Sequence, residues 1–186
     1  INYDWWDYMK RVSLKPLEVS DAGEVYELCR GTFREEYHIT EERILESLFE
    51  DPDFSAEESK KIVDEKNGRM IGFIGVKVSH NEQLYPASAW ISIFVVKKEE
   101  QGKGYGTMVL NQVCQSLHKN GINKIYVGQD FNNFFSGIPD PDEGKEIFFK
   151  KNGFTLNRDR HFDLEADITD NRLIDSFDTS SFDKEF

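Results

Sequence analysis

The segment from Ala89 to Val127 constrains the fold more than any other part of the chain. It begins with a run from Ala89 to Val96 that is apolar on both faces and therefore predicts a central strand. A turn with three glycines follows, and from about Gly106 apolar residues recur at the spacing of an amphipathic helix. Residues 122–127 predict another strand. Such a unit requires a right-handed crossover if its two strands are parallel.

The chain before this unit predicts one short strand, two helices and a hairpin. Val12–Leu17 predicts an edge strand, because Pro16 lacks an N–H group for a second neighbour. One helix is expected after an N-cap at Ser20–Asp21 and another from near Thr40. Two strand-like runs flank a dipeptide that suits a tight turn; they are Lys61–Asp64 and Met70–Val78, on either side of Asn67-Gly68.

The last part of the chain predicts a loop, a helix and two short strands. The loop covers Gln129–Asp142, the helix runs from Asp142 through Lys151, and the candidate strands are Phe154–Leu156 and His161–Leu164. The resulting class is α/β (α+β), with helices flanking one sheet. We expect a single domain over residues 1–165. Residues 166–186 are expected to form an acidic, mostly extended or disordered tail or linker.

Composition excludes several classes of function. The net charge of −12 and the pI near 4.8 argue against nucleic-acid binding, which needs clustered Lys and Arg. The acidity suits a cationic acceptor, although solubility alone is the simpler explanation. The apolar runs are far shorter than the roughly 20 residues of a membrane span, and the first residues lack the pattern of a signal peptide, so a cytoplasmic location is expected.

Cysteine and histidine usage predicts no metal site. Cys29 and Cys114 fall on the apolar faces of predicted helices, which indicates buried free thiols. The four histidines share no metal-ligand spacing with each other or with the cysteines.

The glycine-containing turn is the strongest candidate for a binding site. A strand that ends in such a turn before a helix leaves backbone N–H groups pointing into one concavity, where the helix dipole favours a phosphate or pyrophosphate. The spacing does not fit the dinucleotide fingerprint, and no Gly-Lys-Ser/Thr closes the turn as in a Walker loop. By itself, the turn could also be only a tight connection.

This turn and a second, later segment resemble two motifs of one known protein family. Gln101-x-x-Gly104-x-Gly106 resembles the Gln/Arg-x-x-Gly-x-Gly/Ala signature of the GNAT superfamily of N-acetyltransferases. Glu146–Phe154 resembles the family's second cofactor-side segment, Phe-Tyr-x-x-x-Gly-Phe, and the element order from Val12 to Leu164 agrees. The resemblance implies a mixed, mostly antiparallel central sheet with a parallel, splayed strand pair. The loop Phe134–Pro139 further resembles a subgroup of bacterial members found in tandem or fused forms.

The resemblance also implies acetyl-coenzyme A (acetyl-CoA) as cofactor. The end of the predicted strand would pair its backbone with the pantetheine arm, and the turn would hold the pyrophosphate with Lys103 as a charge partner. Asp142 and Phe149, later in the chain, would also lie near the cofactor. The cofactor-binding candidates are therefore Phe94, Val95, Val96, Gln101, Gly102, Lys103, Gly104, Tyr105, Gly106, Thr107, Asp142 and Phe149. Asp142 is equally explained as a helix cap.

Catalysis in this family is direct attack by an acceptor amine, which here would belong to a small molecule or a peptide. The usual general-acid tyrosine corresponds to Phe149, which has no hydroxyl group. Tyr126 is the candidate acid, with a core aromatic as the alternative. Asp130 and Glu35 or Glu36 are candidate bases, each of which could instead be a solvated charge.

Two alternatives to an active enzyme follow from the sequence. The chain could be a catalytically silent acyl-CoA-binding module, because Phe149 lacks the acid, or one half of a tandem protein, because of its acidic tail. Exposed aromatic residues would also allow a homodimer.

Overall fold

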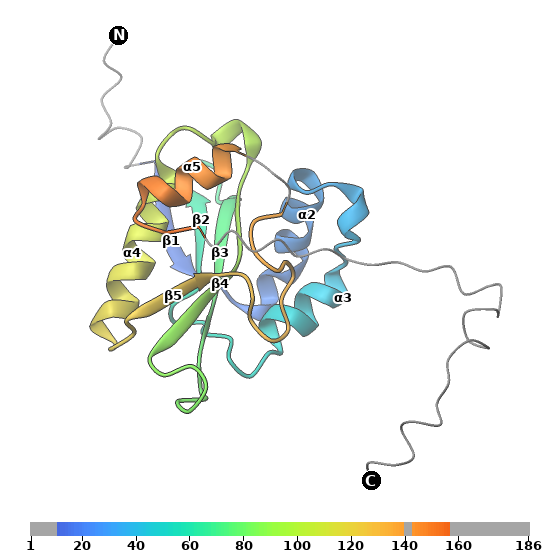
Figure 1. Cartoon of the computed structure of the whole chain (residues 1–186). Helices are drawn as coiled ribbons and strands as arrows, with labels where there is room; N and C mark the ends of the chain where they lie inside the picture. Colours follow the sequence, from blue (N-terminus) through green and yellow to red (C-terminus); the bar gives the residue numbers. More distant parts are fainter. Residues whose placement is uncertain (1–10, 140–142, 157–186) are drawn as a thin grey trace, which may run out of the picture. The chain divides into compact units, whose positions relative to one another are not determined.

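A five-stranded mixed sheet forms the centre of the protein (Figure 1). The computed structural model describes residues 11–139 and 143–156. The strands are β1 (Val12–Pro16), β2 (Lys60–Asp64), β3 (Met70–Val78), β4 (Ser88–Val96) and β5 (Lys124–Val127), and they lie in the order β1-β2-β3-β4-β5. Neighbours from β1 to β4 are antiparallel, whereas β4 and β5 are parallel. The predicted fold class, including its single parallel pair, is confirmed.

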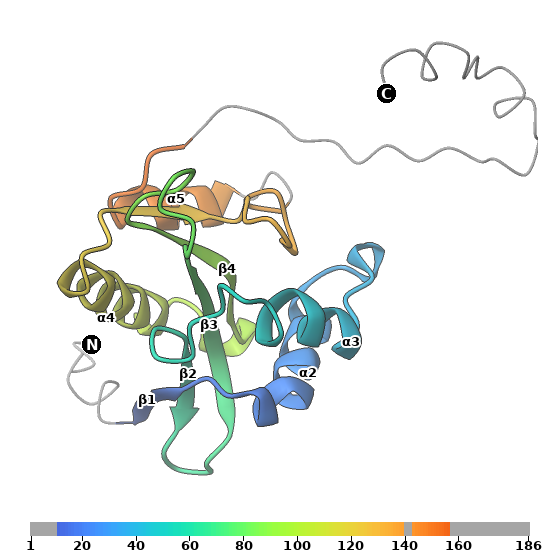
Figure 2. The same cartoon turned by 90° about the horizontal axis from the view of Figure 1, so that it is seen from below.

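Helices cover both faces of this sheet. They are α2 (Ala22–Thr32), α3 (Glu41–Ile44) with its π-helical continuation η3 (Leu45–Phe49), α4 (Tyr105–Lys119) and α5 (Glu143–Lys151); three short 3-10 turns are η1 (Val19–Asp21), η2 (Glu35–Tyr37) and η4 (Lys98–Glu100). Figure 2 shows α4 on one side of the strands and α2 and α3 on the other. All described residues belong to one unit that ends at Leu156.

The two predicted helix starts differ in how they are capped. The helix expected from near Thr40 begins at Glu41, and Thr40 caps it, because its hydroxyl oxygen accepts a hydrogen bond from the Arg43 N–H group at 3.1 Å. The Asp21 carboxylate does not cap α2. It accepts from the Glu18 N–H group at 2.9 Å and pairs with Lys61 Nζ of β2 at 2.6 Å. Asp21 therefore ties the beginning of α2 to the sheet, a role that depends on a residue distant in sequence.

The sheet separates two core layers, and an extra residue in β4 changes which of the two layers its side chains enter. Gly75 pairs with Ile93 and Val76 with Ile91, so Ser92 is a bulge between them. The bulge changes the face to which the following side chains point. Ile91 lies in the core under α4, whereas Ile93 lies in the core under α2 and α3. Cys29 is buried in this second core, and neither it nor the half-buried Cys114 forms a disulfide, as predicted.

The predicted strand over Phe154–Leu156 is wrong, because these residues form no strand. Phe154 instead closes α5: its N–H group donates to the Phe149 carbonyl at 3.0 Å, and the two rings lie 5.4 Å apart. The other candidate strand of this region, His161–Leu164, lies outside the described residues. Asp142, the predicted domain boundary at 165 and the acidic tail lie outside them as well.

Candidate functional site

The two parallel strands separate partway along β4. Their pairing runs from Ser88 opposite Lys124 to Ile91 opposite Val127. The Gly128 N–H group then donates to the Ile91 carbonyl at 2.9 Å. Beyond that bond, β4 continues to Val96 while the chain after β5 turns away, and no described strand pairs with this edge. The splayed pair that the family resemblance implied is therefore present.

Among the described residues, no strand pairs with the backbone groups at the outer edge of this separated part of β4. The Lys97 N–H group donates to the Ile71 carbonyl at 2.8 Å, which directs Lys97 toward β3. In an antiparallel ladder this direction alternates, so Val95 also faces β3, whereas Phe94 and Val96 face the opposite edge. The Val96 carbonyl accepts a hydrogen bond there from Gln101 Nε2 at 2.9 Å. An extended ligand could pair with this edge as an added strand would.

The glycine-containing turn opens onto the start of α4. Gly102 and Gly104 have φ angles of 74° and 86°, which other residues adopt at a cost. The first backbone bond of α4 runs from the Met108 N–H group to the Gly104 carbonyl at 3.0 Å. The N–H groups of residues 105–107 therefore have no helical acceptor. Gly104 is the N-cap and has no side chain to cover them, so the turn can receive an anion.

Side chains around the turn modify its charge. Lys103 Nζ pairs with Glu100 Oε2 at 2.9 Å, and both side chains are mostly buried. An incoming phosphate would therefore compete with Glu100 for this cation. Tyr105 is buried, and burial followed by the nearby Glu100 charge raises its pKa. Because its ring points into the core, only its backbone N–H group could serve a ligand.

Four phenylalanines form one wall of the separated strands. Phe94 of β4 lies 5.8 Å from Phe148 and 6.5 Å from Phe149, both on α5, and Phe154 extends the group. A Cβ atom on Gly106 would lie 3.4 Å from the Phe148 ring, which is ordinary van der Waals contact, so α4 lies directly against α5 here and an alanine would also fit. Phe149 is buried in this apolar group. It lies next to β4 and offers no titratable group, and a role of Phe149 in cofactor binding remains a prediction.

Tyr126 lies away from Phe149. It pairs with Trp90 in the sheet, and the two rings are stacked with centroids 6.2 Å apart. Phe94 is four residues further along β4, which corresponds to roughly 13 Å. Ile125 and Val127 pack against the core under α4, so the alternation of side chains directs Tyr126 to the opposite face. The structure does not bring Tyr126 and Phe149 together, and an acid role for Tyr126 remains a prediction.

Asp130 belongs to a buried ionic network. One of its oxygens pairs with Lys77 Nζ at 2.5 Å, and the other accepts from the Ser92 hydroxyl at 2.8 Å. Lys77 also pairs with Asp51 at 2.9 Å and donates to the Asn132 carbonyl at 3.1 Å. The interpretation of Asp130 as a solvated charge is wrong, because only 4% of the residue is exposed. The network fixes the loop after β5 to the sheet at the Ser92 bulge.

One feature of the sequence points to this network. Lys77 lies within the apolar strand β3, where a lysine on a buried face needs an acidic partner. Which acids would supply that partner depends on the fold, since Asp51 and Asp130 lie far from Lys77 in the chain. Glu35, another candidate base, is exposed on η2, and the side chain of the alternative, Glu36, lies outside the description. Within the described part of the chain, no helix could cross a membrane.

Comparison with known proteins identifies a sequence family that this chain matches. The sequence profile of the "Acetyltransferase (GNAT) family" matches residues 22–136. Among curated protein sequences, none matches the chain significantly.

Three solved structures illustrate the similarity. A glucosamine N-acetyltransferase region of a fungal multi-domain β-N-acetylglucosaminidase superposes with a TM-score of 0.69 at 21% identity, over 80% of this chain and 17% of that one. The ribosomal-protein-S18-alanine N-acetyltransferase of Escherichia coli gives 0.59 at 15% identity, over 77% of both chains. The NatC complex, solved with a Gag peptide and CoA, gives 0.61 at 14% identity, over 80% of this chain and 87% of that one. At such identities the likeness concerns the fold, and the chain spans less than a fifth of the fungal protein.

Proposed function

The chain belongs to the GNAT family of acetyltransferases, and on that premise we propose that it uses acetyl-CoA to acetylate an amine of a small molecule or a peptide. The observation that carries the proposal is the free outer edge of β4 beside an open helix start. Few ligands need both features at once. Acetyl-CoA does, because it combines an amide-containing arm with a pyrophosphate.

The backbone groups of the site suit the two parts of this cofactor. The amides of the pantetheine arm would pair with the free N–H and C=O groups of Phe94 and Val96. The pyrophosphate would accept from the N–H groups of the turn, from Gln101 to Thr107. Binding would replace two existing contacts, the bond from Gln101 Nε2 to the Val96 carbonyl and the pair of Lys103 with Glu100. Solved relatives support this assignment, since one of them contains bound CoA.

The bound cofactor supplies an activated thioester carbonyl, which an acceptor amine attacks directly in this family. The residues of this chain would contribute mainly by positioning the cofactor. The β4 edge would orient the arm, and the Phe94–Phe148–Phe149 group would keep water from one side of it. Asp130 would act indirectly, because its bonds to Lys77 and Ser92 hold the loop that follows β5.

Thermal unfolding of the full chain tests the cofactor site. Acetyl-CoA at about a hundred times its dissociation constant should add about 2.7 kcal/mol of stability, a shift of several degrees, and free CoA should act similarly. ATP is the control, because it has phosphates but no pantetheine arm. Equal shifts with ATP and acetyl-CoA would show that the β4 edge plays no part.

A second assay tests transfer itself. We expect the release of free CoA when acetyl-CoA is mixed with amine acceptors, for which amino sugars and short peptides are the first candidates, since relatives act on such acceptors. If acetyl-CoA raises the unfolding temperature but no amine causes the release of CoA from it, cofactor binding is supported and the enzymatic part of the proposal is contradicted.

That last outcome corresponds to the second candidate function, a catalytically silent acyl-CoA-binding module. The observation that favours it is Phe149, which is buried among three other phenylalanines and has no proton to give. The variant Phe149→Tyr should raise the rate of CoA release if a hydroxyl at this position is what the site lacks. Phe148→Tyr, one residue earlier on α5, is the matched control. Equal rates for both variants and the wild type would show that this position is not limiting.

A further inference from the structure

The chain leaves the edge of β4 directly after the junction of the two parallel strands. Gly128 and Gln129 both have left-handed backbone conformations, with φ angles of 66° and 64°. A Cβ atom on Gly128 would lie 2.6 Å from the Phe135 carbonyl oxygen, so only glycine fits there. The Gln129 N–H group donates to the same carbonyl at 3.4 Å. Residues 129–137, which we call the post-β5 loop, therefore fold back on themselves instead of continuing beside β4.

Asp130 anchors this loop to one face of the sheet. Its carboxylate is buried, accepts a hydrogen bond from the Ser92 hydroxyl of β4 at 2.8 Å and pairs with Lys77 Nζ of β3. A left-handed conformation at a residue other than glycine, as at Gln129, is unfavourable and persists only where surrounding contacts hold it. The buried contacts of Asp130, the next residue, supply that hold.

The later part of the loop follows the same face of the sheet. Phe134 is buried in the core under α2 and α3, which also contains Ile93 and Val95 of β4. The Phe134 carbonyl accepts a hydrogen bond from Arg43 Nη2 of α3 at 3.2 Å. The loop thus packs on the face of the separated half of β4, and no described strand pairs with the outer edge of that half.

We infer that Asp130 is a positioning residue for the cofactor arm, an inference that rests on the proposed function. Its bonds to Ser92 and Lys77 keep the post-β5 loop away from the outer edge of residues 93–96, so this edge is open before a cofactor binds. Parallel pairing is already established at Ile91, so a released loop would lie beside the same edge and compete with the arm. A site that is open in advance binds its ligand at a lower cost in ordering.

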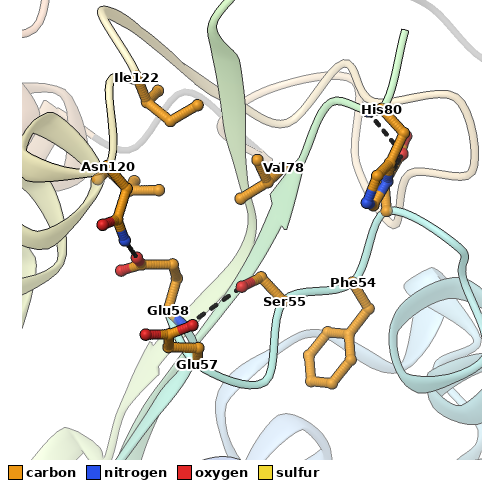
Figure 3. A pocket seen from close by; sticks show the side chains of 10 residues that line it. Phe54, Ser55, Glu57, Glu58, Val78, His80, Asn120 and Ile122 are labelled. Atoms are coloured by element: carbon orange, nitrogen blue, oxygen red, sulfur yellow. Dashed lines mark hydrogen bonds and ion pairs between the residues drawn. The ribbon is translucent and has the colours of Figure 1, made fainter.

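A second buried carboxylate provides a matched control. Glu58 is only 3% exposed, and its Oε1 atom accepts from the Ser116 hydroxyl at 3.1 Å and from Asn120 Nδ2 at 2.6 Å. Like Asp130, it therefore joins a serine hydroxyl and a nitrogen donor. Figure 3 shows Glu58 directed toward Asn120, which follows the C-terminal end of α4, whereas the glycine-containing turn precedes the other end, about 22 Å away. Removing Glu58 thus reports what the loss of a buried carboxylate does to the fold alone.

Isothermal titration calorimetry of the full chain with CoA tests the inference. Asp130→Ala should weaken CoA binding about tenfold or more, whereas Glu58→Ala should bind CoA as the wild type does. Asp130→Asn keeps an acceptor oxygen for Lys77 and should recover most of the affinity. Inorganic pyrophosphate has no arm and needs the glycine-containing turn alone, so its affinity should be the same in Asp130→Ala and in the wild type.

Hydrogen exchange of the ligand-free protein tests the anchor without any ligand. The backbone amides of residues 129–137 should exchange faster in Asp130→Ala than in the wild type, and at the wild-type rate in Glu58→Ala. If Asp130→Ala does not fold, Ser92→Ala takes its place, with Ser116→Ala as its control. Each of these two variants removes one hydroxyl donor from a buried carboxylate.

Other results would overturn the inference. Equal CoA affinities of Asp130→Ala and the wild type would do so, and so would an equal loss of pyrophosphate affinity, which would indicate general damage to the site. Faster exchange throughout the sheet as well as in the loop would show that Asp130 only stabilises the fold. Absence of CoA binding to the wild type would contradict the proposed function, and with it the role toward the arm, while hydrogen exchange would still decide whether Asp130 holds the loop.

Discussion

The two halves of β4 differ in what lies along their outer edge. Residues 88–91 pair with β3 on one side and β5 on the other, so their backbone is fully used by the sheet. Within the described part of the chain, residues 93–96 pair with β3 alone, and Ser92 is the bulge between the two halves. Both halves are largely buried on their faces, so the difference concerns hydrogen bonding and not burial. One strand can therefore serve as scaffold over half its length and as a recognition surface over the other half.

The largest expected effect concerns the junction of the two halves. Lys77→Met removes the cation that Asp130 and Asp51 share, and leaves both carboxylates buried without it. Breaking a buried pair in this way costs about 3–5 kcal/mol. Urea unfolding of the wild type and the variant measures the loss. A second change, Asp130→Asn in the Lys77→Met background, should recover part of it, and a loss below about 1 kcal/mol in the single variant would contradict a structural role for the network.

Adjacent proline variants test which edge each residue faces. Val95→Pro removes an N–H group that faces β3, whereas Val96→Pro removes one that faces the open edge. Val95→Pro should lower the free energy of unfolding by about 1–3 kcal/mol more than Val96→Pro, because it leaves a buried carbonyl without its donor. Val96→Pro should instead reduce the thermal shift produced by acetyl-CoA. Equal stability losses would mean that the assignment of the two edges is wrong.

A smaller effect separates the binding turn from an ordinary turn. Gly102 and Gly68 have similar φ angles of 74° and 70°, and a Cβ atom on either would meet nothing within 4 Å. An alanine at each position should cost about 1 kcal/mol through backbone strain. Only Gly102→Ala should also weaken acetyl-CoA binding, since Gly68 lies in the β2–β3 hairpin. Titrations of both variants measure this difference, and equal affinities would remove the turn from the cofactor site.

The smallest expected effect concerns the core beneath residues 93–96 of β4, the half without a second neighbouring strand among the described residues. Cys29 packs there with Ile93 and Val95, and burial raises the pKa of its thiol to about 12. The unfolded thiol ionises near pH 9, so this group lowers stability as the pH rises above 9 and has no effect below it. At pH 8 a thiol reagent should modify the half-buried Cys114 much faster than Cys29. Rapid modification of Cys29 would show that the opening at the β4 edge reaches into the core.

Local patterns were sufficient to predict most of the fold. The apolar run of β4, the Asn67-Gly68 turn and the start of a helix near Thr40 each depend on neighbours in sequence, and each was predicted. The glycine-containing turn was located for the same reason. The parallel, splayed pair came only from the family resemblance, because no local pattern states which strands pair.

Contacts between distant residues could not be predicted in the same way. The Ser92 bulge, the partners of Lys77 and the pairing of Asp21 with Lys61 depend on the packed fold. The strand expected over Phe154–Leu156 is wrong for a related reason, since packing and not the local pattern decides that Phe154 closes α5 against Phe149. The alternatives for Asp130, a candidate base or a solvated charge, did not include a buried ion pair, because sequence alone does not show that a lysine faces it.

The open edge of β4 has a consequence for the ligand-free protein. Unpaired N–H and C=O groups along a strand are a template for strands of other molecules, and such edges promote aggregation. This edge is only a few residues long, and the amide of Gln101 already occupies the Val96 carbonyl at its end. The Gln101 side chain thus occupies one acceptor of the unpaired strand edge, and a ligand that pairs with the edge would displace it. The backbone best suited to recognise a ligand is also the part of the chain that most needs protection from other copies when no ligand is present.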